Sequence, residues 1–222
     1  MAGIKVLYID ENIIVIDKPC GVPSQSDPSG DKDAMTLAGE YLAEIGEKND
    51  LWLVHRLDRT VGGILVFARN KKSAAYISEK IANGGFNKKY LAVAHGSVVG
   101  GELIDYIYKD SALSKAFVVK TLRRGAKEAR LICDPIKESD GMTLIRVKLL
   151  SGRFHQIRVQ LASRAHPLIG DKKYGSKDAI RRTPCLYSSN VSFDLFGKTI
   201  DITSLPDRNE YPWSKFDLSD AL

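Results

Sequence analysis

The stretch LWLVHRLDRTVGGILVFA, residues 51–68, determines what fold we expect for the first part of this chain. It contains two apolar runs, Leu51–Val54 and Ile64–Ala68, of the length and composition typical of buried strands. The residues between them, His55–Gly63, are polar and include glycine, which favours a turn. The stretch therefore predicts two buried strands joined by a turn that carries charged side chains.

The flanking sequence extends this pattern in both directions. Residues 4–9 and 13–17 are rich in Ile and Val and predict short strands, and the Pro- and Gly-containing segment 18–23 predicts a loop. Helices are expected over residues 35–45 and 71–82, the second with Asn70 as its N-cap. Further predicted elements are strands at Tyr90–Ala94, Ala116–Thr121, Ala129–Cys133 and Thr143–Leu149, a helix through Phe154–Ser163, and a hairpin of Cys185–Phe193 and Thr199–Ile202 about Phe196-Gly197.

Strands that follow one another with few interposed helices indicate an α+β fold. We expect a mostly antiparallel central sheet with flanking helices and a basic catalytic cleft. No composition break or linker divides the chain, so residues 1–222 are predicted to form a single domain.

Composition limits the classes of function. The chain has 33 Lys and Arg against 27 Asp and Glu, a net charge of +6 and a pI near 9.1. This excess suits a polyanionic partner, although many basic proteins bind nothing acidic. The three distant cysteines predict no disulfide framework and the histidines lack metal-ligand spacing, so no metal is expected. The sequence contains no long apolar run, so neither a secretory signal nor a membrane span is expected. A cytoplasmic location is the expectation.

Two segments carry candidate functional residues. In the first, Arg56 and Arg59 flank Asp58 within the predicted turn, either as a structural ion pair or as a carboxylate held ready as a nucleophile or base. In the second, a helix would place His155 and Arg158 on one face and apolar residues on another, so that Arg158 faces a cleft. The alternative for the second segment is an ordinary basic surface helix.

Together the segments resemble the RluA-type pseudouridine synthase family. The resemblance rests on HRLDRTVGGILV (55–66), GRFHQIR (152–158), HPLIGDKKYG (166–175), DKPCG (17–21) and KKYLAV (88–93). These motifs occur in the family's order over roughly residues 5–205, which makes the match specific. The chain departs from the family where Thr60-Val61-Gly62-Gly63 replaces Thr-Ser-Gly, where Gln160 replaces a His, and where Ala165 replaces a Gly.

The resemblance implies an RNA pseudouridine synthase without a cofactor. It implies that Asp58 is the catalytic carboxylate and that Arg158 pairs with it. Tyr90 would stack on the uracil, with a proton-carrying role also open, and Arg56 would fill the space left by the flipped uridine. The expected partner is structured RNA, either ribosomal or transfer RNA, and a monomer is expected.

Other readings remain open on the sequence alone. One is an RNA-binding or RNA-folding protein without catalysis, and another is a hydrolase in which Asp171 is the second acid. The small extra RNA-binding domain of some family members is not recognised before residue 5, which favours transfer RNA or a short ribosomal stem-loop. Basic residues in two stretches are candidates for phosphate contacts, although only a minority is expected to touch RNA. They are Arg69, Lys71, Lys72, Lys80, Lys88 and Lys89, and Lys115, Lys120, Arg123, Arg124, Lys127 and Arg130.

Overall fold

The computed structural model describes residues 4–221, which form two compact units. Unit 1 comprises the residues up to Lys88 together with Tyr187–Pro206. Unit 2 comprises Lys89–Leu186 and the residues from Asp207 onward. Strand β5 (Phe86–His95) begins in unit 1 and continues into unit 2. The expectation of a single catalytic domain over the whole chain stays a prediction.

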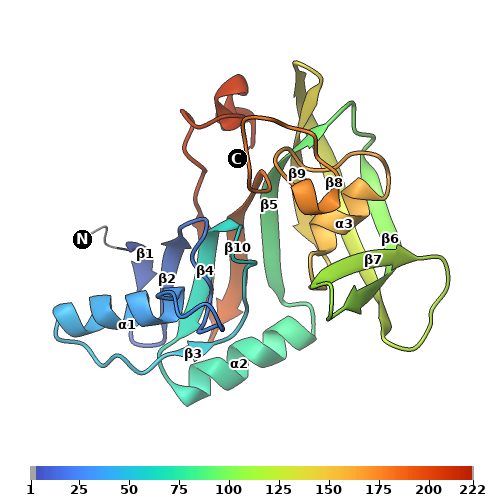
Figure 1. The fold of residues 1–222 in the computed structure, drawn as a ribbon. Helices are drawn as coiled ribbons and strands as arrows, with labels where there is room; N and C mark the ends of the chain where they lie inside the picture. Colours follow the sequence, from blue (N-terminus) through green and yellow to red (C-terminus); the bar gives the residue numbers. More distant parts are fainter. Residues whose placement is uncertain (1–3, 222) are drawn as a thin grey trace. The chain divides into compact units, whose positions relative to one another are not determined.

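The strands of unit 1 are those predicted around the deciding stretch, and they follow the order β1-β2-β4-β10. In addition, β3 pairs with β4 (Figure 1), and β11 pairs with β10. The pairs β1–β2, β2–β4, β3–β4 and β10–β11 are antiparallel, whereas β4 and β10 pair in parallel. The bounds are β1 (Lys5–Ile9), β2 (Ile13–Lys18), β3 (Trp52–Leu53), β4 (Gly62–Ala68), β10 (Leu186–Leu195) and β11 (Lys198–Thr203).

Strand β4 is buried along its whole length, as its unbroken apolar sequence predicted. Successive side chains of a strand point to opposite faces, so a strand that is apolar throughout must be covered on both. On one face Ile64 and Val66 join Ile13 and Val15 of β2 in a core that also includes Ile77. Two helices provide the cover.

These helices begin at capping residues. Helix α1 (Ala34–Glu44) is capped by Asp33, whose carboxylate accepts the Thr36 N–H at 3.0 Å. Helix α2 (Lys71–Ala82) is capped by Asn70, as predicted, with the Ser73 N–H at 2.8 Å. Each cap satisfies a backbone donor that the first turn leaves unpaired. Helix α1 packs against β2, and α2 packs against β3 and β4.

Unit 2 contains the strand order β5-β9-β8-β6-β7. Its remaining strands are β6 (Gly101–Asp110), β7 (Lys115–Val119), β8 (Ala126–Ser139) and β9 (Met142–Leu149). Strand β6 was not predicted, because Asp105 occupies a position between Leu103 and Ile107 on one face and breaks the apolar alternation. Its carboxylate is satisfied by Gln160 at 2.8 Å and Arg164 at 2.7 Å. The α+β class with a mostly antiparallel sheet is confirmed.

Helix α3 (Gln156–Ala162) covers β6 and β7 in unit 2. It starts two residues later than predicted, because His155 adopts a left-handed conformation with φ of 52° and ends the preceding turn. Residues 156–161 are all buried. The alternative of an ordinary basic surface helix was therefore wrong, because Arg158 is an interior residue. That Arg158 faces a cleft stays a prediction.

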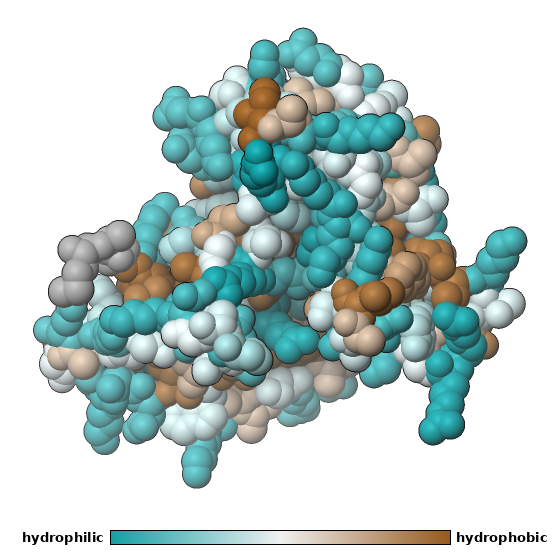
Figure 2. Space-filling model, viewed as in Figure 1, coloured by the Kyte–Doolittle hydropathy of each residue, from teal (hydrophilic) through white to brown (hydrophobic). Residues whose placement is uncertain are grey.

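Short 3-10 helices complete the chain at Lys172–Tyr174, Trp213–Lys215 and Leu218–Ala221. The face drawn in Figure 2 is mostly hydrophilic, with hydrophobic side chains in small groups. In the described part of the chain, no helix is long and apolar enough to cross a membrane.

The close contact of β4 with β10 predicts that Gly63 is irreplaceable. Its φ is +109°, and a Cβ atom there would lie 2.3 Å from the Ser188 carbonyl oxygen. We expect Gly63→Ala to lower the free energy of unfolding by about 3 kcal/mol or more, through backbone strain plus overpacking. Gly84→Ala is the matched control, since Gly84 also has positive φ but open space around its Cβ position. The control should lose only about 1–2 kcal/mol, and equal losses in urea unfolding would contradict the steric explanation.

Candidate active site

Asp58 lies in the turn between β3 and β4 and is half-buried. Its two neighbours differ: Leu57 is buried, and Arg59 is exposed. The backbone of Leu57 exchanges two hydrogen bonds with the Ser24 hydroxyl, at 3.0 and 2.8 Å. The Asp58 carbonyl accepts the Val61 N–H at 3.0 Å, which closes the turn. The carboxylate is thus carried by a backbone that is fixed on both sides.

His55 holds the start of this turn and takes no charge near neutral pH. Its Nε2 accepts the Val66 N–H at 3.1 Å, so the ring is locked onto β4. Burial, with a smaller contribution from Lys88, lowers the pKa of His55 to about 3. A neutral ring held by a backbone donor is suited to supporting the turn rather than to transferring protons.

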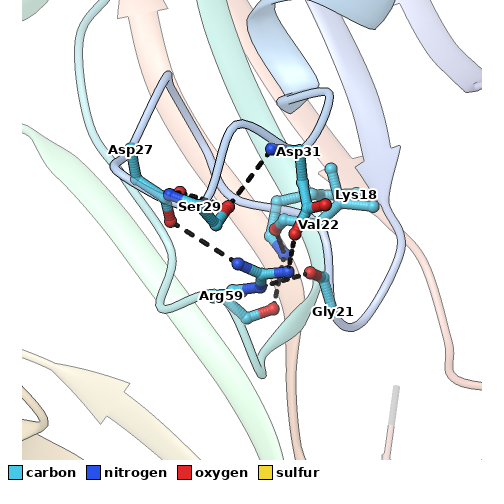
Figure 3. Close-up of polar contacts among 7 residues, drawn as sticks. All are labelled: Lys18, Gly21, Val22, Asp27, Ser29, Asp31 and Arg59. Carbon is cyan, nitrogen blue, oxygen red and sulfur yellow. Dashed lines mark hydrogen bonds and ion pairs between the residues drawn. The ribbon is translucent and has the colours of Figure 1, made fainter.

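Lys18 is a buried cation beside the Asp58 turn that the sequence analysis did not single out. Its side chain is 0% exposed at the end of β2, and its Nζ donates to the Pro19 carbonyl at 2.9 Å. The same Nζ donates to the carbonyls of Val22 and Arg59 at 2.6 and 3.3 Å (Figure 3). Burial lowers the pKa of Lys18 to about 8, although the nearby Cys20 and Asp58 favour the charged form. The signal was present in the strand alternation, which places Lys18 on the face of the buried Ile14 and Ile16.

Arg158 forms a buried, two-pronged ion pair with Asp171 in unit 2. Its Nε and Nη2 donate to the two carboxylate oxygens at 2.7 and 2.8 Å, and the residues are 5% and 1% exposed. A bidentate guanidinium–carboxylate pair fixes the plane of the arginine. Asp171, considered above as the second acid of a hydrolase, therefore serves to orient Arg158. The pairing of Arg158 with Asp58 stays a prediction.

Tyr174 and His155 complete the surroundings of Arg158. The guanidinium carbon lies 5.1 Å from the centre of the Tyr174 ring. The Tyr174 hydroxyl accepts the Ala116 N–H at 2.8 Å and lies 2.9 Å from His155 Nδ1. Burial lowers the pKa of His155 to about 3, and Arg158, Lys173 and Lys109 add to this effect. A neutral His155 can accept the hydroxyl proton at Nδ1, which assigns the ring proton to Nε2.

The other two predicted site residues, Tyr90 and Arg56, differ in exposure. Tyr90 is buried in β5 at 6% exposure, whereas Arg56 is exposed on the turn before Asp58. Asp58 and Arg56 belong to unit 1, and Tyr90 and Arg158 belong to unit 2. The assembly of these four residues into one site stays a prediction. Among residues 4–221 no group of His, Cys, Asp and Glu side chains could hold a metal ion.

Several of the basic residues proposed for an RNA surface are engaged within the protein. Arg69 pairs with Glu47 at 2.8 Å, and Arg130 pairs at 2.6 Å with Glu102 on the unpredicted strand β6. The exposed basic residues of the second stretch are Lys120, Arg123, Arg124 and Lys127, in addition to the paired Arg130.

The buried ion pair predicts a large loss of stability when its acid is removed. We expect Asp171→Ala to lower the free energy of unfolding by about 3–5 kcal/mol, because it removes one partner of a buried ion pair. Glu102→Ala, which breaks the exposed pair with Arg130, should cost no more than about 1 kcal/mol. Urea unfolding of both variants measures the difference. Similar losses would show that the buried Arg158–Asp171 pair contributes no more stability than the exposed pair.

His55 predicts that acid weakens the fold. A folded pKa near 3 against about 6.5 in the unfolded chain means that stability is complete above pH 6.5 and declines as the pH falls towards 3. Between pH 7 and 5 the contribution of His55 is a loss of about 2 kcal/mol. His55→Gln keeps an acceptor for Val66 and removes the titration, so its unfolding free energy should fall less steeply with pH. Parallel curves for wild type and variant would refute this account.

Comparison with known proteins identifies the family of this chain. The model of the RNA pseudouridylate synthase family matches residues 12–163, more than half of the chain. A protein of Aquifex aeolicus named as an uncharacterized RNA pseudouridine synthase is 32% identical over 185 residues, which cover 79% of this chain and 57% of that protein. The ribosomal large subunit pseudouridine synthase D of Yersinia pestis is 30% identical over 176 residues, covering 78% and 53%. The chain thus spans little more than half the length of these two relatives.

The fold is shared with solved structures as well. Human RNA pseudouridylate synthase domain containing 4 is similar with a TM-score of 0.77 at 22% identity, over 91% of this chain and 89% of that one. At this identity the likeness shows the fold alone, and the family model and the sequence relatives show the membership. On these findings the chain belongs to the RNA pseudouridylate synthase family, in agreement with the RluA-type resemblance of its sequence.

Proposed function

We propose that the protein isomerises specific uridines in structured RNA to pseudouridine, with Asp58 as the catalytic carboxylate. The observation that carries the proposal is the placement of Asp58: a half-buried carboxylate on a tethered turn, within the matched family segment. The reaction breaks the N1–C1′ bond of uridine, turns the base and joins C1′ to C5. The C5 proton leaves and N1 gains one, so the reaction is balanced without an oxidant or a cofactor.

The roles of the other residues follow from their chemistry. Arg158, already oriented by Asp171, would hold the Asp58 carboxylate in its ionised form. The buried phenol of Tyr90 would stack on the uracil and keep the detached base in place. The exposed Arg56 guanidinium is suited to stack where the flipped uridine had been. Attack of Asp58 on the sugar, attack on the base and removal of a sugar proton are all compatible with this arrangement.

The substrate is proposed by class. The relative from Yersinia pestis is named for the large ribosomal subunit, so ribosomal RNA is the first substrate to test and transfer RNA the second. Exposed basic residues on the β7–β8 connection would contact phosphates and make binding weaken with salt. A monomer acting in the cytoplasm is part of the same proposal.

The test is to delete the gene in its own host and map pseudouridines across all stable RNAs. We expect one or a few sites to vanish, and only the wild-type gene to restore them. Asp58→Ala should restore none, because no other group can replace a lost catalytic carboxylate. Asp50→Ala, which removes an exposed aspartate, is the matched control and should restore them fully.

Other outcomes have definite meanings. Full rescue by Asp58→Ala would remove Asp58 from the mechanism. If no pseudouridine changes while the protein still binds RNA, the protein is an RNA-binding protein without catalysis. Release of free uracil from RNA would indicate a hydrolase.

A further inference from the structure

Arg59, the residue after Asp58, is joined by its backbone and its side chain to one loop. The Gly21 N–H donates to the Arg59 carbonyl at 2.8 Å, and Arg59 Nε donates to the Gly21 carbonyl at 2.9 Å. The buried Lys18 ammonium also donates to the Arg59 carbonyl. Residues 21 and 59 are therefore paired in both directions (Figure 3).

The outer end of the guanidinium makes ionic contacts further along the same loop. Its Nη2 donates to Asp31, and its Nη1 lies 3.8 Å from Asp27 Oδ2. The two acids are linked through Ser29, whose N–H and hydroxyl donate to Asp27 Oδ1 at 2.9 and 2.5 Å and whose hydroxyl accepts the Asp31 N–H at 3.2 Å. Hydrogen bonds to Ser29 and the charge of Arg59 lower the pKa of Asp27, and Arg59 is the main cause of the lowered pKa of Asp31.

The loop is also fixed at its beginning and its end. It starts at the end of β2 and leads into α1, where the Ala34 N–H donates to the Pro23 carbonyl at 2.8 Å. Between these points Ser24 holds Leu57. The residues on either side of Asp58, Leu57 and Arg59, are thus both attached to residues 21–31. Among the described residues of unit 1, the hydrogen bonds and ion pairs of the Arg59 side chain go to this loop alone, at Gly21, Asp27 and Asp31.

We propose that Arg59 is a positioning residue, whose guanidinium fixes loop 21–31 against the turn and so sets the direction of the Asp58 carboxylate. The inference rests on the proposed function, since it assigns Arg59 a part in that reaction. The alternative to this positioning role is that Arg59 faces the substrate and binds an RNA phosphate.

The Arg59 contacts should affect the reaction rate and the unfolding free energy to different degrees. The Arg59, Asp27 and Asp31 side chains are 42%, 34% and 56% exposed, and such ion pairs contribute at most about 1 kcal/mol each. A displacement of about 1 Å in a catalytic group, however, can slow a reaction by up to about 100-fold. Loss of the contacts should therefore change the rate more than the unfolding free energy.

The experiment measures single-turnover rate and RNA affinity for Arg59→Ala, for Asp27→Asn/Asp31→Asn and for Lys32→Ala. The last breaks an exposed pair with Glu40 beside the loop and is the control. We expect Arg59→Ala to reduce the rate roughly 10- to 100-fold with affinity changed less than about threefold. The double Asn variant should lower the rate in the same direction, and Lys32→Ala should match wild type.

A phosphate-binding role gives the opposite pattern. Neutralising Asp27 and Asp31 would then release Arg59 and leave RNA affinity unchanged or increased, while Arg59→Ala would weaken affinity and spare the rate. Either result overturns the proposal. The exchanged pair Arg59→Asp/Asp31→Arg should recover part of the rate if the contact itself matters, and no recovery together with weaker RNA binding also argues for phosphate.

A second measurement does not depend on activity. Amide hydrogen exchange over residues 20–31 and 56–61 should be faster in Arg59→Ala and in the double Asn variant, and unchanged in Lys32→Ala. Unchanged exchange in Arg59→Ala overturns the proposal, whatever the activity. If the wild type modifies no RNA, the proposed function fails, the rate role of Arg59 fails with it, and the exchange data show whether the loop attachment stands.

Discussion

Burying an ammonium group costs several kcal/mol unless other oxygen atoms replace its water. Lys18 meets this requirement with three backbone carbonyls, two from its own loop and one from Arg59 on the turn that carries Asp58. The carbonyls must converge on one nitrogen, so the loop after β2 and the turn before β4 are held to a single arrangement. The Ser24–Leu57 bonds and the Arg59 contacts then extend this arrangement on both sides of Asp58.

Unit 2 also buries a cation, and a carboxylate takes the place of the backbone carbonyls there. The guanidinium of Arg158 is buried, and Asp171 supplies a carboxylate with matching geometry. Tyr174 packs on the guanidinium and is itself fixed by the Ala116 N–H. Both units thus immobilise a buried cation through oxygen acceptors contributed by a neighbouring loop. Such preorganisation is what a reaction that depends on orienting one carboxylate requires.

Burial makes the two motif histidines poorly suited to proton transfer. His55 and His155 lie beside the candidate residues, where proton transfer could be imagined from sequence. Burial lowers the pKa of each to about 3, and each is occupied by a structural partner, the Val66 N–H or the Tyr174 hydroxyl. Proton transfer in the proposed reaction is therefore left to carboxylate and phenol groups. The same burial makes the fold sensitive to acid.

The sequence by itself determined the elements that local chemistry controls. The unbroken apolar run of β4, the Asn70 cap of α2 and the Phe196-Gly197 hairpin depend on residues close in the chain, and the ordered motifs were sufficient to assign the family. The tertiary structure alone decided the partners. Asp105 concealed strand β6 because its hydrogen-bond donors, Gln160 and Arg164, come from a segment more than 50 residues away. The pairs Lys18–Arg59, Ser24–Leu57 and Arg158–Asp171 join residues 13 to 41 positions apart. Local periodicity describes which face a side chain occupies, but long-range packing determines which group meets it there.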